Sequence, residues 1–280
     1  MRKSNLLLIF ILSSTFTFSQ DAVDLNKQGI ELAKKGKIGK AFELFEKAIE
    51  IDPEFVGAYS NRGNVYRMQK KYDLAIKDYT KSIQLNPSNL NIIYARANTF
   101  LDLGNFESAI NDYSSIIDKK PRFPDIYFDR AYANIRLENY EKAKKDFELQ
   151  LNITPNDFKS LANLINIKKK LELYDEALTD YDKILKQFPN QSNLHIVYNN
   201  RASLYQEIDD YEKALVDINK ALKIKKNYDI GLFNRAGIYM KLGNEKKACQ
   251  DFKKALKLGL ESNEHFKADE DFKDLKKLCE

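Results

Sequence analysis

Arginine recurs at a fixed interval along this chain, and its guanidinium group has well-defined binding chemistry. Arg62, Arg96 and Arg130 are evenly spaced, and the same interval separates Arg201 from Arg235 further along. A planar guanidinium binds a carboxylate or a phosphate through two parallel hydrogen bonds. The row could therefore recognise an acidic partner, or it could pair with carboxylates inside the protein.

An aspartate follows each of these arginines after sixteen residues. At the equivalent places one interval before the row, Gln28 and Leu44 stand instead. In the gap within the row, Leu164 precedes Asp180 by the same sixteen residues. Since the two residue types occur together five times and are jointly absent once, we expect ion pairs within the protein, with a ligand site as the alternative. The expected pairs are Arg62 with Asp78, Arg96 with Asp112, Arg130 with Asp146, Arg201 with Asp217 and Arg235 with Asp251.

Other reactive side chains are scarce. The chain has two histidines, His195 and His265, and two cysteines, Cys249 and Cys279. We find no zinc-ligand spacing, no glycine-rich phosphate loop and no serine–histidine arrangement, so we expect no metal, no cofactor and no enzymatic activity. The cysteines could form a disulfide in an oxidising compartment. A buried thiol beside a frayed terminus is the alternative, because sequence does not show the spacing of the two cysteines.

The overall composition is that of a folded protein with a heavily charged surface. Of 280 residues, 43% are hydrophobic and 31% are charged, and the formal net charge is +5. Because the two signs are interspersed along the chain, we expect no nucleic-acid partner.

The first nineteen residues have the layout of a secretory signal peptide. Arg2 and Lys3 precede an apolar run from Leu6 to Leu12, and Ser19 suits the last position before a cleavage site. The run is short for a membrane span, although an uncleaved N-terminal anchor is the alternative. We therefore expect a mature chain without a membrane span that is exported to the periplasm or the extracellular space.

Prolines and alanines show that the rest of the chain is repetitive. Five prolines are separated by the same interval as the arginines, and each interval contains two stretches with apolar residues at helical spacing. Proline closes the second stretch, since it cannot continue a helical hydrogen-bond ladder. Alanine keeps the same step, with one interval lengthened by three residues: Ala41, Ala75, Ala109, Ala143, Ala177, Ala214 and Ala248.

These residues resemble the tetratricopeptide repeat, a pair of helices with small residues at positions 8 and 20, an aromatic residue at 24 and a final proline, repeated every ~34 residues. The resemblance implies an all-α fold, a right-handed superhelical solenoid of seven helix pairs, because one repeat cannot bury its own apolar stripe. We number the repeats one to seven over residues 22–259. Their expected ranges are 22–55, 56–89, 90–123, 124–157, 158–194, 195–228 and 229–259, followed by a C-terminal capping helix in 260–280.

The resemblance also implies where a partner binds, since the first helices of the family line a concave groove. Asparagine and aromatic residues dominate the corresponding places, which suits an extended peptide, although a merely solvated polar surface is the alternative. Asn61 matches one asparagine of the family's carboxylate clamp, whose basic residues are missing here. We expect a protein or peptide partner, with a self-associating structural role as the alternative and the oligomeric state open. The expected groove residues are Asn26, Asn61, Asn64, Tyr94, Asn98, Phe128, Tyr132, Asn166, Asn199 and Phe233.

The fifth repeat departs from the pattern. Ile165 replaces the small residue at position 8, Lys168 replaces the large residue at position 11, and the closing loop carries the three-residue insertion. These departures predict looser packing there, between a block of five repeats and a block of two.

Overall fold

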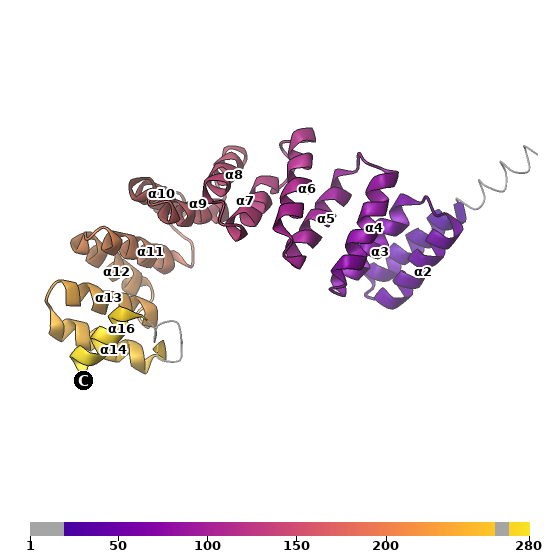
Figure 1. Cartoon of the computed structure of the whole chain (residues 1–280). Coiled ribbons are helices and arrows are strands. Elements are labelled where there is room, and N and C mark those ends of the chain that lie inside the picture. Colours follow the sequence, from indigo (N-terminus) through magenta and orange to yellow (C-terminus); the bar gives the residue numbers. More distant parts are fainter. Residues whose placement is uncertain (1–19, 261–268) are drawn as a thin grey trace, which may run out of the picture. The chain divides into compact units, whose positions relative to one another are not determined.

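The computed structural model describes residues 20–260 and 269–280 (Figure 1). The expected signal peptide, residues 1–19, lies outside this part. Within the described residues the regular elements are helices, so the predicted all-α repeat fold is confirmed. Residues 20–34 form the first helix. It is followed by α2 (Ile38–Ile51), α3 (Val56–Met68), α4 (Tyr72–Leu85), α5 (Leu90–Leu103), α6 (Phe106–Lys119), α7 (Ile126–Arg136), α8 (Tyr140–Ile153), α9 (Phe158–Lys170), α10 (Tyr174–Gln187), α11 (Leu194–Glu207), α12 (Tyr211–Ile224), α13 (Asp229–Lys241), α14 (Glu245–Lys257) and α16 (Glu270–Cys279).

The chain divides into two compact units, with the boundary between Ile153 and Thr154. Unit 1 contains repeats one to four and unit 2 contains repeats five to seven. The prediction of a block of five repeats and a block of two is therefore wrong about the position of the break. The fifth repeat belongs to unit 2 because α9 packs against α10, and α10 packs against α11 despite the inserted residues.

Each repeat makes the same tight turn between its two helices. The residue at position 15 has a positive φ, which a glycine adopts without steric cost. Glycine occupies this place in three repeats, whereas lysine, glutamate or aspartate adopts the same conformation in the other four. The seven residues are Gly36, Lys70, Gly104, Glu138, Glu172, Asp209 and Gly243, with φ between 57° and 86°.

Small residues allow the two helices of a repeat to approach closely, and aromatic side chains fill the space beside the contact. A Cβ atom added to Gly29 would lie 2.5 Å from the ring of Phe45, and one added to Gly63 would lie 3.0 Å from the ring of Tyr79. The seven alanines that mark the repeats are all fully buried. Such close packing explains why a larger side chain at these places would force a rearrangement.

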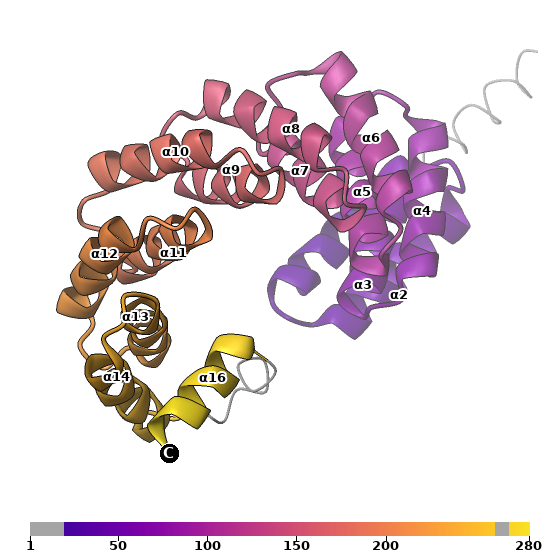
Figure 2. The ribbon, with the colours of Figure 1, turned by 60° about the vertical axis from the view of Figure 1, so that its left-hand side comes forward.

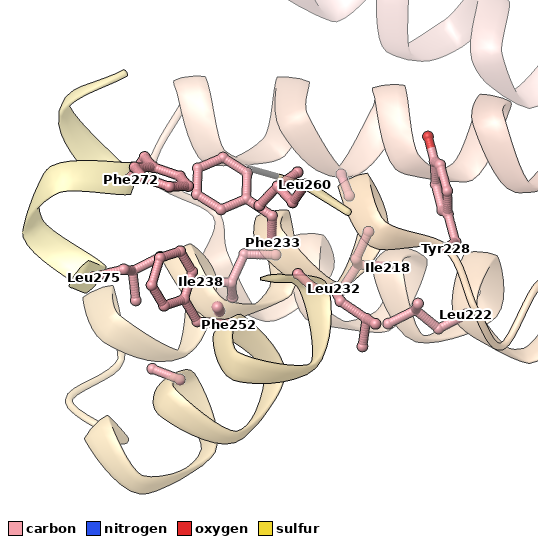
Figure 3. Packing of buried hydrophobic residues seen from close by; sticks show 14 of the residues in the cluster. Ile218, Leu222, Tyr228, Leu232, Phe233, Ile238, Phe252, Leu260, Phe272 and Leu275 are labelled. Atoms are coloured by element: carbon pink, nitrogen blue, oxygen red, sulfur yellow. The ribbon is translucent and has the colours of Figure 1, made fainter. Parts of the chain in front are cut away.

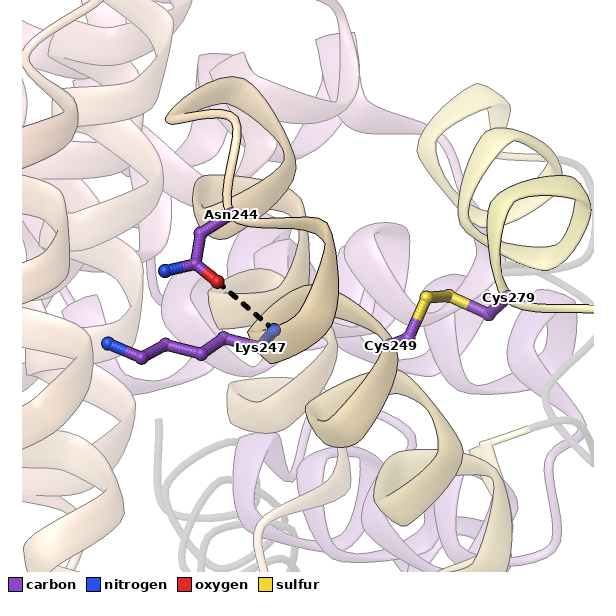
Figure 4. Close-up of a disulfide and its surroundings, with 4 residues drawn as sticks. All are labelled: Asn244, Lys247, Cys249 and Cys279. Atoms are coloured by element: carbon purple, nitrogen blue, oxygen red, sulfur yellow. Dashed lines mark hydrogen bonds between the residues drawn. A yellow bond between two sulfur atoms is a disulfide. The ribbon is translucent and has the colours of Figure 1, made fainter.

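Helix α16 caps the last repeat. It packs on α13 and α14, as Figure 2 shows for this unit. Phe272 and Leu275 of α16 are buried in the cluster that includes Phe233 and Phe252 (Figure 3). Cys279 is joined to Cys249 of α14 by a disulfide, with the two Cα atoms 5.2 Å apart (Figure 4). The cap is thus held by apolar packing and by a covalent link.

Candidate functional site

The five arginines of the row each bind the aspartate of their own repeat. Arg62 donates from Nε to Oδ2 of Asp78 at 2.8 Å and from Nη2 to Oδ1 at 2.9 Å. The other four pairs have the same two-bond geometry, with distances from 2.5 to 3.0 Å. All five aspartates are buried between the helices of their repeat. The guanidinium groups therefore hold the repeat together, and their forks are not free for a ligand.

The remaining nitrogen of each arginine reaches the second helix of the preceding repeat. Nη1 of Arg96 donates to the hydroxyl of Thr80 at 3.1 Å, and Nη1 of Arg130 donates to Ser114 at 3.0 Å. Nη1 of Arg201 donates to Asp182 and Nη1 of Arg235 to Asn219, whereas Nη1 of Arg62 forms an ion pair with Glu46 at 3.7 Å. Sequence analysis missed this contact. The sequence does indicate this contact, because a polar residue stands sixteen places before each of the other four arginines. For Arg201, which follows the three-residue insertion, the polar residue stands nineteen places before it.

These contacts favour the charged form of Arg62 and Arg201. The hydrogen bond that Arg62 donates to Asp78 is the largest influence on Arg62 and raises its pKa. Burial is the largest influence on Arg201 and opposes its charge, but the bond to Asp217 and the negative charges of Asp217 and Asp182 together outweigh burial, so the pKa is raised as well. Arg62 and Arg201 thus remain protonated at any ordinary pH.

The fifth repeat holds its aspartate with lysine. Lys168, which is buried, donates to Oδ2 of Asp180 at 2.6 Å and lies 3.2 Å from Glu176. Lys183 binds the other oxygen of Asp180, also at 2.6 Å. Burial disfavours the charge on Lys168, but the bonds to the two carboxylates outweigh it and raise the pKa of the ammonium group. The residue that broke the repeat pattern therefore replaces the missing arginine.

Three of the expected groove residues are buried and take part in packing. Asn26 is 7% exposed and accepts a hydrogen bond from Asn61 at 2.8 Å, and Asn199, 4% exposed, accepts one from Asn234 at 2.9 Å. Phe233 is 5% exposed and its ring lies 6.2 Å from that of Phe272.

These positions connect neighbouring first helices or lie beneath the cap. We therefore remove Asn26, Asn199 and Phe233 from the candidate contact surface, and the predictions for them are corrected. Asn61 is half-buried and its amide nitrogen is engaged by Asn26.

Two further residues expected in the groove are oriented by tyrosines of the same repeat. The hydroxyl of Tyr79 donates to Oδ1 of Asn64 at 2.7 Å, and that of Tyr113 donates to Oδ1 of Asn98 at 2.6 Å. Burial raises the pKa of Tyr79 to about 12, so the hydroxyl stays protonated and remains a donor. Asn64 is exposed and Asn98 is half-buried, which leaves their amide groups toward the first-helix face.

The remaining expected residues vary in exposure. Tyr132 is 42% exposed and Asn166 is exposed, whereas Tyr94 and Phe128 are half-buried. Tyr94 donates to Oδ2 of Asp129 at 2.6 Å, a bond between neighbouring first helices. Burial raises the pKa of Tyr94 to about 12 and also raises the pKa of Asp129.

The first helices also carry ion pairs between repeats that were not predicted. Arg67 binds Asp102 at 2.8 Å in unit 1, and Lys169 binds Glu207 at 2.9 Å in unit 2. Both pairs join position 12 of one repeat to position 13 of the next. Each pair adds one positive and one negative charge to the first helices of its own unit.

Over residues 20–260 and 269–280, no cluster of three metal-binding side chains is found. In the same ranges, no helix has both the length and the apolar character required to cross a bilayer.

Sequence models of the tetratricopeptide repeat match residues 29–70, 56–89, 94–155, 196–228 and 231–258. Together they cover more than half of the chain, and the helix pairs follow the same interval. The chain belongs to the tetratricopeptide repeat family. Repeats of this family are generally non-catalytic scaffolds that bind proteins or peptides.

Two relatives share part of this tetratricopeptide repeat chain. Tetratricopeptide repeat protein 36 of Caenorhabditis elegans is 37% identical over 57 residues, 20% of this chain and 32% of that protein. An uncharacterised protein of Methanocaldococcus jannaschii is 39% identical over 49 residues, 18% of this chain and 57% of that protein. The matches thus span about a third and just over half of the relatives' lengths.

Solved structures of tetratricopeptide repeat proteins match over longer ranges. One from Parabacteroides merdae has 25% identity and a TM-score of 0.60, covering 93% of this chain and 99% of its own. The C-terminal part of one from Cytophaga hutchinsonii has 22% identity and a TM-score of 0.73, covering 85% and 96%. YrrB, described as having an unusual peptide-binding site, has 21% identity and a TM-score of 0.56, covering 67% and 95%. The last two matches show the fold.

Proposed function

We propose that this protein is an exported, non-enzymatic scaffold that binds a protein or an extended peptide on the face formed by its first helices. The observation that carries the proposal is the pair of asparagines fixed by tyrosine hydroxyls in repeats two and three. Because each hydroxyl occupies the carbonyl oxygen of its asparagine, the amide N–H groups are turned outward as donors. Donors at the same position of neighbouring first helices can bind successive backbone carbonyls of an extended chain, whatever its side chains.

Apolar and charged groups around these asparagines would add affinity and direction. Met68 is 67% exposed, and Tyr132 presents an amphipathic ring on the same set of first helices. Methionine adapts to different side chains, and tyrosine offers contact area at a small entropic cost. YrrB, whose fold is similar, is described as a protein with a peptide-binding site, which agrees with a peptide as the ligand class.

Peptides selected against the full chain from a random display library would test the binding face. Fluorescence anisotropy should show that Asn64→Ala combined with Asn98→Ala weakens a selected peptide about tenfold, because two hydrogen bonds to the ligand backbone are lost. Asn111→Ala is the matched control, since Asn111 is exposed on a second helix of the same unit. Equal affinities for the double variant, the control and the wild type would remove the first-helix face as the site.

The orientation of the asparagines gives a finer test. Tyr79→Phe keeps the ring in the core but removes the hydroxyl that holds Asn64. The variant should bind the selected peptide two- to fivefold more weakly while its melting temperature changes little. Unchanged affinity would show that orientation of Asn64 contributes nothing to binding.

Self-association is the competing structural role. Size-exclusion chromatography with light scattering, over a hundredfold range of protein concentration, should give the monomer mass if the chain is an adaptor. A mass that rises to a fixed oligomer, together with failure to select any peptide, would favour the self-assembling role instead.

Export is tested by the mass of the mature product. Cleavage after Ser19 would give a chain that begins at Gln20, recovered outside the cytoplasm of a host with a general secretion pathway. A full-length chain that stays with the membrane fraction would instead indicate an uncleaved anchor. Recovery of the full-length chain from the cytoplasm would contradict export.

A further inference from the structure

Positive charge is concentrated in unit 2 between the start of α12 and the end of the seventh repeat. Residues 211–259 contain twelve lysines and arginines but five aspartates and glutamates, a net charge of +7, whereas the whole chain has +5. Two of those five carboxylates, Asp217 and Asp251, are buried and bound to arginine. The exposed surface of residues 211–259 is therefore at least as basic as the count suggests, which differs from the even mixing of charges expected for the whole chain.

A cavity of about 260 Å³ lies within this basic region, between α12, α13 and α14. Leu222 and Leu232, which are 7% and 2% exposed, form its apolar floor, and its basic lining residues are Lys223, Lys226, Arg235 and Lys254. Arg235 is already engaged by Asp251 and Asn219. In the part of the chain that the structure describes, the three lysines form no ion pair. Their ammonium groups are exposed and available to a ligand.

Unit 1 has a cavity at the equivalent place between its first two repeats, which serves as an internal comparison. It measures about 540 Å³ and includes Arg62, Lys77 and Lys81, but also Asp78. In the first repeat, Glu50 occupies the position that corresponds to Lys223, and Pro53 occupies the position that corresponds to Lys226. Arg62 also lies 3.7 Å from Glu46, the counterpart of the neutral Asn219. The repeat architecture therefore produces the cavity in both units, while the excess positive charge is specific to unit 2.

We propose that the cavity of unit 2 is a docking site for an acidic segment of a partner protein that also carries aliphatic side chains. Charge complementarity selects the acidic partner, and the two leucines favour an aliphatic group between the lysines. Ile224, which is 51% exposed between Lys223 and Lys225, extends the apolar surface next to the cations.

The chemistry of the cations favours carboxylates on a polypeptide over a single phosphate. The guanidinium fork that would bind a phosphate through two bonds is occupied by Asp251. The free groups are ammonium ions on α12, on the turn after it and on α14, which act as separate point charges. Exposed lysines continue along α14, at Lys246, Lys247, Lys253 and Lys257, so that several carboxylates of an extended segment find partners. This site uses the second helices and is independent of the first-helix face proposed above.

The probe is a fluorescein-labelled decapeptide of alternating glutamate and leucine, measured against the full chain by fluorescence anisotropy. The triple variant Lys223→Ser, Lys226→Ser, Lys254→Ser should bind it about tenfold more weakly, because three charge contacts are lost. The matched control is Lys47→Ser, Lys77→Ser, Lys81→Ser, which removes the same charge from the second-helix side of unit 1. The control should change affinity less than twofold, and binding by the wild type should weaken as salt is raised.

Several results would overturn the proposal. One is failure of the wild type to bind the peptide, and another is an equal loss in the two triple variants. Equal affinity for an alternating glutamate–serine decapeptide would remove the role of the leucines. Stronger competition by inorganic phosphate or by a short oligonucleotide than by the unlabelled peptide would assign the site to phosphate. The Asn64→Ala, Asn98→Ala variant should bind the acidic peptide like the wild type, so this test is separate from that of the first-helix face.

Discussion

In the third repeat, in unit 1, an arginine of the first helix binds the buried aspartate of that repeat. In the fifth repeat, in unit 2, the buried aspartate is bound instead by a lysine, which lies one helical turn further along the first helix. Arg96 makes two bonds to Asp112 and a third to Thr80 of the preceding repeat. Lys168 has a single nitrogen, which is used on Asp180 and Glu176 of its own repeat. The aspartate is thus the constant element, and the cation that neutralises it can come from either of two positions on the first helix.

The comparison also separates two roles of the arginine. Inside a repeat it neutralises the aspartate, and between repeats of one unit it binds a polar group of the preceding second helix. The first repeat of each unit, repeats one and five, has Gln28 or Leu164 at this place. Lysine can supply the first role but not the second, because an ammonium group lacks the fork that points in two directions.

The largest effect is expected from removing the lysine of repeat five. Lys168→Met should destabilise unit 2 by about 3–5 kcal/mol, because Asp180, 1% exposed, would keep only the exposed Lys183 as a partner. Urea unfolding, with hydrogen exchange to locate the loss in α9 and α10, measures the effect. Lys170→Met, on the exposed end of the same helix, is the control and should change stability little. A similar loss in both variants would show that Lys168 has no special role.

Unit 2 also differs from unit 1 in its covalent link. Cys249→Ser with Cys279→Ser opens a loop of 30 residues and should cost about 3–4 kcal/mol by the chain-entropy argument. Amide exchange in α16 should accelerate while exchange in α3 to α6 stays the same. If α16 remained protected, apolar packing of Phe272 and Leu275 would be sufficient to hold the cap.

The ion pair between Arg96 and Asp112 in unit 1 is tested by removing the carboxylate of Asp112. Asp112→Ala leaves Arg96 without its main partner in a half-buried position and should cost about 2–3 kcal/mol. Thermal melting should show the loss, while the affinity for a selected peptide is retained. Asp118→Ala, an exposed residue of the same helix, is the control. Lost peptide binding at an unchanged melting temperature would instead make the pair part of the ligand site.

A smaller effect is expected from the contact between repeats. Thr80→Val removes the hydroxyl that accepts from Arg96 and should cost about 1 kcal/mol, whereas Thr80→Ser keeps it and should cost less. Equilibrium unfolding of the two variants side by side makes the measurement. Equal stability of the valine and serine variants would mean that the third contact of the arginine contributes nothing.

The smallest effect is expected from raising the pH, which should remove the charge of Lys168 but not that of the arginines. The pKa of Lys168 is raised above its ordinary 10.5, so its contribution is complete below that value and is lost as pH rises through the raised pKa. Arginine stays charged throughout this range. The difference in unfolding free energy between wild type and Lys168→Met should therefore shrink above pH 10.5. A constant difference would show that packing of the lysine stem, not its charge, is responsible.

The repeat interval was sufficient to predict the helix pairs and their contacts. Alanine and glycine at the close approach, aromatic rings beside them and proline at the end all act within a single repeat, so periodicity exposes them. The pairing of arginine with aspartate was also predictable, because the two residues occur together. The role of Lys168 was not, since it appeared as a departure from the pattern. Recognising this role required knowing that a side chain at the place of Lys168 can reach Asp180 on the second helix of the same repeat.

The candidate contact surface was predicted less well. Family positions place Asn26, Asn64 and Asn199 on one face, yet two are buried and one is exposed. Which asparagine meets solvent depends on whether the neighbouring first helix offers a partner, as Asn61 and Asn234 do. Sequence spacing within one repeat contains no information about which side chains of the neighbouring repeat lie within hydrogen-bond distance.

The amino-acid sequence by itself determined the helices, their order and the carboxylate that each repeat from the second onward must neutralise, because these follow from local periodicity and from the cost of burying an unpaired charge. Only the tertiary structure decided where the chain divides, which asparagines point outward and which lysines form no ion pair with the other described residues. Those properties depend on side chains from different repeats meeting within a few ångströms, and such meetings are set by packing between helices.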